Sequence, residues 1–154
     1  MQELEKTVRA VLAALDACKL TLRDAERIAH AVEEKAREMG MKIVVAVCDE
    51  GGNPLLLHRM EGAFIASCNI AENKAFTSVS LKMPTKELAT LAAPGGSLYG
   101  IQFTNGGRIV IFGGGEPLER GGKIVGGVGV SGGTAEQDTF LGAYARQYFS
   151  EEIK

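Results

Sequence analysis

This sequence offers few histidines, the side chains best suited to carry a proton near neutral pH and common ligands of metal ions. It has two histidines, His30 and His58, and no H-x-x-x-H or H-E-x-x-H spacing. A structural zinc site takes four Cys or His ligands and usually shows such spacings. The sequence therefore argues against structural zinc, and each histidine must be judged by the element that carries it.

His30 lies on the polar side of a helix expected from about residue 22 to 39, together with Glu34 and Arg37. It is either an exposed helix residue or a ligand that faces an oligomer interface or a bound cofactor. His58 shares one face of an expected strand with Leu56 and Met60. A histidine in that position is more often a core or interface residue than a ligand.

Two glycine-rich segments, Gly113–Pro117 and Gly126–Gly133, form the next group with chemical potential. Residues 129–133 match G-x-S-x-G, but no histidine follows Ser131, which excludes the α/β-hydrolase chain order. The segments also lack the G-x-x-x-x-G-K-[ST] phosphate loop. They can still present backbone N–H groups to an anion at the start of the last helix. The alternative is a tight structural turn.

Glu72 interrupts the apolar stripe expected on a third helix, from about residue 63 to 81. A carboxylate there is costly unless it is paired or solvated. Either Glu72 lies at the wet edge of the stripe, or it lines a pocket. Lys74 falls on a different side of this helix and is not an obvious partner for Glu72.

The elements that position these residues follow from hydrophobic periodicity and from turn signals. Helices are expected at 2–16, 22–39, 63–81, 84–91 and 134–148, and strands at 42–48, 54–60, 108–112 and 123–130. The turn Asp49–Asn53 is too short for a crossover, so the strands that it joins are antiparallel. Paired strands separated by helices favour an α+β fold.

Composition limits the remaining options. The 154 residues fit a single domain, with residues 1–19 as an extra N-terminal helix. The net charge of -2 argues against nucleic-acid binding, and no apolar run is long enough to cross a membrane. The N-terminus lacks the basic start and apolar core of a signal peptide, which favours a cytoplasmic location.

An ordered set of motifs resembles the GlcG/HbpS-like family, which includes the C-terminal domain of PduO-type proteins. The motifs cover roughly residues 20 to 148. They are Asp49-Glu50-Gly51-Gly52, Arg59-Met60-Glu61-Gly62-Ala63, Ile70-Ala71-Glu72-Asn73-Lys74-Ala75-Phe76-Thr77, Phe112-Gly113-Gly114-Gly115-Glu116-Pro117, Val125-Gly126-Gly127-Val128-Gly129-Val130-Ser131-Gly132-Gly133 and Glu136-Gln137-Asp138.

The resemblance implies a profilin-like α+β fold, with an antiparallel sheet of about five strands and flanking helices. It also implies homo-oligomers, heme binding in some members, and ties to glycolate, diol and corrinoid metabolism. On this basis the first hypothesis is a domain that binds heme, a corrinoid such as cobalamin, or a related tetrapyrrole. His30 or His58 would reach the metal, with His30 the candidate iron ligand, and Arg59 or Lys74 would pair with propionates.

Two further hypotheses remain open. One is an enzyme acting on a small hydroxy acid or diol, with Glu72 or Glu116 as base. In it, the segments Gly113–Pro117 and Ser131–Gly133 would line the site. The backbone N–H groups of Gly113, Gly114, Gly115 and the Ser131–Gly133 turn would contact an oxyanion or a carboxylate. The other is a structural partner in a catabolic assembly.

Overall fold

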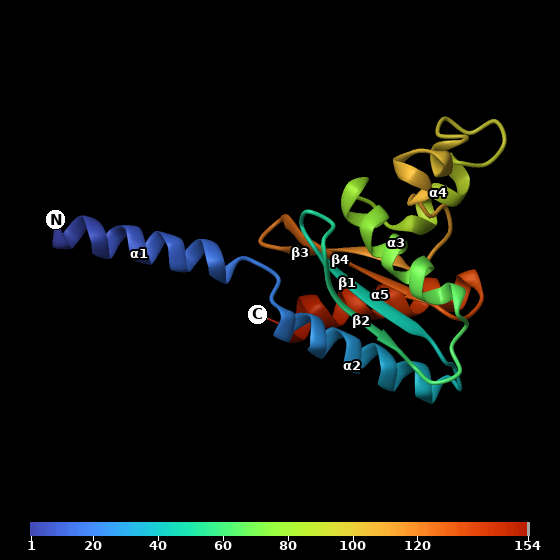
Figure 1. The fold of residues 1–154 in the computed structure, drawn as a ribbon, viewed down its shortest axis with the longest axis horizontal. Helices are drawn as coiled ribbons and strands as arrows, with labels where there is room; N and C mark the ends of the chain where they lie inside the picture. The colour runs from blue at the N-terminus through green and yellow to red at the C-terminus, as the bar shows by residue number, and fades with distance from the viewer. Residues whose placement is uncertain (154) are drawn as a thin grey trace.

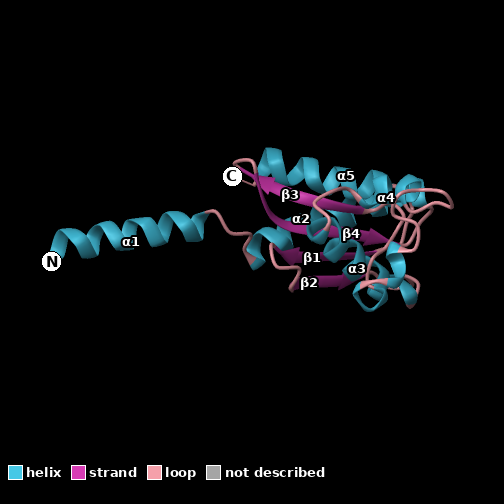
Figure 2. Cartoon of the chain, turned by 90° about the horizontal axis from the view of Figure 1, so that it is seen from above, coloured by secondary structure: helices cyan, strands magenta, loops and turns pink. Residues whose placement is uncertain are grey.

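The computed structural model describes residues 1–153. The centre of the fold is an antiparallel sheet (Figures 1 and 2). The strands are β1 (Val44–Asp49), β2 (Pro54–Arg59), β3 (Gly115–Arg120) and β4 (Lys123–Ser131), in the order β2-β1-β4-β3. The helices are α1 (Gln2–Ala17), α2 (Leu22–Glu38), α3 (Ala66–Ser80), α4 (Thr85–Leu91) and α5 (Ala135–Glu152). The fold is therefore α+β, with one antiparallel sheet of four strands and flanking helices.

Side-chain caps fix where α2 and α5 begin. Thr21 accepts a hydrogen bond from the backbone N–H of Asp24, whose carboxylate accepts one from the N–H of Thr21. Thr134 and Gln137 form the same reciprocal pair at the start of α5. These capping boxes satisfy N–H groups that have no partner inside the helix, and they confirm both predicted helix starts.

One face of the sheet packs against α2 and α5. Alternate residues of the strands, such as Val45 and Val128, are buried against Ile28 of α2 and Leu141 of α5. Ala25, Ala29, Val32 and Ala36 of α2 are buried here with Ile28, whereas Leu22 is 53% exposed. This layer fixes the rotation of α2 about its axis, and so decides which of its polar residues can reach the sheet.

The other face packs against α3 without an intervening layer of side chains from β4. A Cβ atom on Gly127 would lie 2.5 Å from the Ser78 hydroxyl oxygen and 2.8 Å from the Ala75 carbonyl oxygen. A Cβ atom on Gly129 would overlap the carbonyl oxygen of Ala71. Part of the glycine-rich composition is thus explained by the close approach of a helix to a strand.

The structure corrects the prediction of about five strands and the prediction of a strand at 108–112. The Ile109–Ile111 run looks like a strand because it is β-branched, but the Val110 N–H donates to the Thr77 hydroxyl of α3 at 3.0 Å, instead of joining the sheet. The strand beside β4 is β3, in a segment predicted to be a connection. This strand was not predicted from the sequence, because Gly115 and Pro117 are residue types that are rare in strands.

The helix α3 also begins later than predicted. Phe64 and Ile65, which fall inside the predicted range 63–81, precede the helix and are 71% and 89% exposed. The helix α4 lies where the sequence predicts it, beginning directly after Pro84.

The helix α1 extends away from the sheet (Figure 1). None of its residues is buried, and its apolar side chains Leu4, Val8, Val11, Leu12 and Leu15 are exposed. Within residues 1–153, no helix combines the length and apolar character needed to span a membrane.

Candidate functional site

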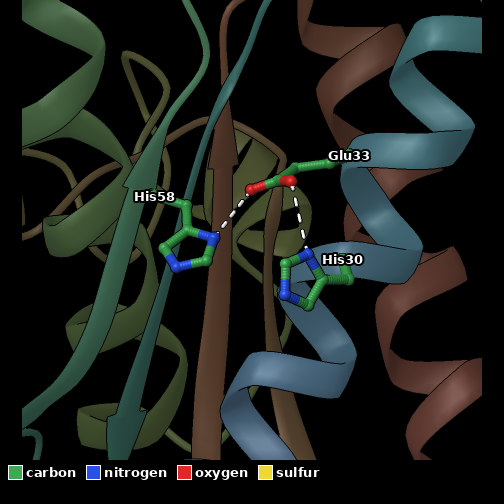
Figure 3. Close-up of side chains that lie close together, drawn as sticks. All are labelled: His30, Glu33 and His58. Atoms are coloured by element: carbon green, nitrogen blue, oxygen red, sulfur yellow. Dashed lines mark hydrogen bonds and ion pairs between the residues drawn. The ribbon is translucent and has the colours of Figure 1, made fainter.

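The two histidines, 28 positions apart, meet around a carboxylate between α2 and β2 (Figure 3). His30 and Glu33 are three residues apart on α2 and therefore lie on one side of the helix. His58 lies on the edge strand β2, opposite Val45, whose side chain faces α2. The three side chains form the His30–Glu33–His58 cluster.

Glu33 bridges the two imidazoles. One of its carboxylate oxygens lies 2.7 Å from Nδ1 of His58, and the other lies 3.6 Å from Nδ1 of His30. The ring centroids of the histidines are 5.6 Å apart in an edge-to-face arrangement. One potential ligand atom from each residue falls within 4.8 Å of the others, so all three can reach a common point.

The cluster is buried at its centre and open on one side. The Glu33 side chain is only 11% exposed, whereas the imidazoles of His30 and His58 are 67% and 35% exposed. Arg37 also approaches Glu33, at 3.4 Å, from the exposed side of α2. A buried carboxylate needs positive or hydrogen-bonding partners, and here these partners are side chains that can move into solvent.

The donor set is suited to a metal or a metal-containing cofactor. Imidazole nitrogen binds zinc, copper, iron and nickel, and a carboxylate can complete such a site. Glu33 was missed in the sequence reasoning, although its i, i+3 spacing from His30 was a usable signal. Its contact with His58 could not be seen from spacing, because it depends on how α2 packs against β2.

Arg59 lies next to His58 in sequence but points to the opposite face of the sheet. Its guanidinium donates to the carbonyl oxygen of Ala63 at 3.3 Å. The structure therefore does not bring Arg59 into the His30–Glu33–His58 cluster, and Arg37 is the arginine that adjoins it.

Lys74 belongs to a second, closed cluster on the α3 side of the sheet. Its side chain has no exposed surface, and its ammonium donates to Asp138 and to the Val130 carbonyl oxygen, both at 2.8 Å. Burial lowers the pKa of Lys74, and the charge of Asp138 opposes that shift. In this structure the ammonium is committed to internal partners and is not available to a propionate.

The glycine-rich segments surround this Lys74–Asp138 cluster. Gly113 through Pro117 and Ser131 are all buried. A Cβ atom on Gly114 would lie 2.8 Å from Nζ of Lys74. The N–H of Gly115 donates to the Thr85 hydroxyl, and that of Gly133 donates to Asp138, each at 2.9 Å. These two N–H groups already have protein partners.

Glu116 combines features of the two clusters, because its carboxylate is buried while its charged partner is partly exposed. Its carboxylate is nearly buried on the α5 side of β3 and is 3.4 Å from the guanidinium of Arg146, which is 45% exposed. Burial raises the pKa of Glu116, while Arg146 and Lys86 oppose the rise. The residue borders an open hollow that Lys86 and Arg146 also line.

Glu72 is half-buried and lines a small apolar pocket of about 110 Å³ between α3 and the strands β1 and β2. Leu57, Ala46 and Ala75 form part of its wall. Glu72 also borders an open polar hollow with Asn69 and Asn73, so it lines a pocket and lies at a solvated edge of the helix at the same time.

Comparison with known proteins shows the family of this chain. Residues 20–146 match the family described as haem degrading protein HbpS-like, so α1 lies outside the match. An uncharacterized 15.0 kDa protein of Citrobacter freundii, from the dhaT-dhaS intergenic region, is 52% identical over 132 residues, which are 86% of this chain and 93% of that protein.

Two further relatives carry informative names. The corrinoid adenosyltransferase PduO of Salmonella typhimurium is 38% identical over 77% of this chain, and the matched part is only 35% of its own length. The crystal structure of a PduOC:heme complex superimposes with a TM-score of 0.81 at 36% identity, covering 84% of this chain and 94% of that one. This chain therefore belongs to the HbpS-like family, and its sheet and the helices α2, α3 and α4 lie inside the matched residues.

Proposed function

We propose that this protein is an oligomeric domain that binds heme or a related tetrapyrrole, with an imidazole of the His30–Glu33–His58 cluster as the iron ligand. The observation that carries the proposal is the pair of histidines on one open surface. Histidine is a common axial ligand of heme iron. A relative at 36% identity whose solved structure is a heme complex supports the same class of ligand. A corrinoid is the related alternative.

The residues present fit a heme at this surface. His30 is the more accessible imidazole, at 67% exposure, so a planar ring can approach it without a change in the core. Arg37 adjoins the cluster and is 59% exposed, which suits it to pair with a propionate. When bound, heme would supply an iron centre whose properties depend on the axial imidazole. Glu33 orients His58 by accepting a hydrogen bond from its Nδ1–H at 2.7 Å, and its other oxygen lies 3.6 Å from Nδ1 of His30.

The same geometry supports a homo-oligomer. The His30 side chain is 67% exposed, so a heme bound to it would lie on the surface with one face open to water. A second copy of the chain would bury that face, and burial of apolar area is the main favourable term in such association.

Hemin titration tests the proposal. We expect a saturable shift of the Soret band in the wild-type protein, a large loss of affinity in His30→Ala, and a smaller loss in His58→Ala. Glu34→Ala, on the same helix, serves as the matched control and should titrate like wild type. No saturable shift, or a shift that is the same in both histidine variants and wild type, would contradict histidine-ligated heme.

A second candidate function has one specific observation in its favour. Glu116 is a buried carboxylate with a raised pKa at the border of an open hollow that also presents Arg146 and Lys86. A carboxylate of this kind suits a general base, and the cations suit a small hydroxy acid. Thermal stabilisation by hydroxy acids that disappears in Glu116→Gln, in the absence of hemin binding, would favour this enzyme over the heme-binding domain.

A further inference from the structure

The His30–Glu33–His58 cluster has the composition of a site for a free metal ion, independent of any porphyrin. Zinc sites with three protein ligands and one open position use combinations such as two histidines and one glutamate. All three ligands are present here on two elements, α2 and β2, which the core packs against each other. From these residues we infer that the cluster chelates one divalent transition-metal ion, for which Zn²⁺ is the probe.

The distances suit this assignment. Ligands at about 2.0–2.2 Å from a tetrahedral Zn²⁺ lie roughly 3.3–3.6 Å from one another. The Glu33 oxygens are 2.7 Å and 3.6 Å from Nδ1 of His58 and His30. Side-chain rotations alone can bring the three atoms to this spacing, because the exposed His30 ring and the edge-strand His58 are free on their outer sides.

The charges of the site also favour a cation. Glu33 is the one carboxylate of the cluster, and only 11% of its side chain is exposed. Its partners in the structure are the two imidazoles and Arg37, at 3.4 Å. Arg37 opposes a second cation at this place, but its 59% exposed side chain can turn into solvent. A bound ion would then replace it as the counter-charge of Glu33.

An ion held by these three residues would keep its fourth position open. Water, or a carboxylate from a small ligand, would complete the coordination. The inference goes beyond the proposed heme site and does not rest on it. Heme needs one imidazole and no carboxylate ligand, whereas the metal-ion site needs Glu33 and both histidines.

The test is titration of Zn²⁺ in a Cys18→Ser/Cys68→Ser background, because these two thiols are exposed or partly exposed and could bind zinc themselves. Cys48 is retained, since burial raises the pKa of its thiol to about 12 and keeps it protonated. We expect one Zn²⁺ per chain. Glu33→Gln and His58→Ala should each weaken binding at least about tenfold, since even the loss of an outer-shell partner of a metal ligand typically costs about 10–100-fold in affinity. Glu34→Gln should bind like the background protein.

Absorption of bound Co²⁺ provides a second measurement that does not depend on stability. Tetrahedral visible bands without a thiolate charge-transfer band should appear in the background protein and be lost in Glu33→Gln, whose fold is checked by circular dichroism. Absence of one-to-one Zn²⁺ binding, or equal binding in Glu33→Gln, would overturn the inference. Hemin titrations of the same proteins keep the two proposals apart: a lost metal site with an intact Soret shift leaves heme binding standing, and the reverse result leaves the metal site standing.

Discussion

The Lys74–Asp138 cluster and the His30–Glu33–His58 cluster are both built around a carboxylate, yet their surroundings differ. Asp138 is 4% exposed and its partner Lys74 is fully buried, with both groups hydrogen-bonded to backbone as well as to each other. Glu33 is similarly shielded, at 11%, but its partners are 35%, 59% and 67% exposed. The Lys74–Asp138 cluster is therefore closed to solvent, whereas an external group can replace the exposed partners of Glu33.

This difference fits a structural role for the closed cluster and the binding role proposed for the open one. The closed cluster joins α3, β4 and the start of α5 through side chains that no ligand can reach. The open cluster places a buried acceptor behind movable imidazoles, which is the arrangement expected where an external group takes the place of an internal one. Residue types alone do not distinguish them, since both contain one acid and basic partners.

The largest effect is expected for Lys74→Met. It leaves Asp138 charged and buried without its ammonium partner, which typically costs about 3–5 kcal/mol. The free energy of unfolding, measured in urea, reports this loss. Lys86→Met, at an exposed position, should change it by no more than about 0.5 kcal/mol. A loss below about 1 kcal/mol in Lys74→Met would show that the cluster is not closed in solution.

Adding Asp138→Asn to Lys74→Met sharpens the same test. It removes the stranded charge, so part of the lost stability should return. The recovery is measured against the single variant in the same denaturant series. No recovery would point to lost packing around the lysine stem, and away from an unpaired carboxylate, as the cause.

A smaller effect on stability is expected from Glu116, whose carboxylate is buried but whose partner Arg146 is partly exposed. Burial raises its pKa in the folded protein, so the folded state binds more protons than the unfolded state between the unfolded and folded pKa values. Its contribution to stability is therefore present at low pH and is lost as pH rises through that interval. Glu116→Gln should remove this component from the pH profile of unfolding.

Glu119→Gln is the control for Glu116. Glu119 also contacts Arg146, at 3.8 Å, but is 45% exposed. Its variant should keep the wild-type pH profile. If Glu116→Gln keeps it as well, the carboxylate is better solvated than its burial indicates.

The smallest change in stability is expected for Glu33→Gln. The amide can still accept a hydrogen bond from His58, and the exposed partners regain water, so the free energy of unfolding should stay within about 1 kcal/mol of wild type. Calorimetric or chemical unfolding without added metal measures it. A loss as large as that of Lys74→Met would mean that the open cluster is also a structural element.

Much of the fold could be predicted from local signals. Thr21 and Thr134 mark helix starts because a cap acts within one turn, and the Asp49–Asn53 turn sets the pairing of β1 with β2. The strand β3 was missed because its place beside β4 is decided by tertiary packing, against the weak strand tendency of Gly115 and Pro117. The strand predicted around Ile109 was wrong for the opposite reason. Its residues favour a strand locally, but they contact α3 and do not join the sheet.

The candidate site was predicted in part. His30 and His58 were recognised by residue type, and the exposed position of His30 followed from the helix period. Their meeting around Glu33 depends on the rotation of α2 against the sheet, which no local pattern encodes. Lys74 was interpreted as a ligand-pairing cation because its partner, Asp138, lies 64 residues away.

The contact of α3 with the bare backbone of β4 has a consequence for how far the sequence can vary. At Gly127 and Gly129 any side chain would collide with the helix, so those positions accept one residue type. On the opposite face, Val128 and Val130 contribute ordinary side chains to the core, where neighbours of similar volume can replace one another. A library randomised at Val128 and Val130 should therefore yield many folded variants, whereas one randomised at Gly127 and Gly129 should return glycine.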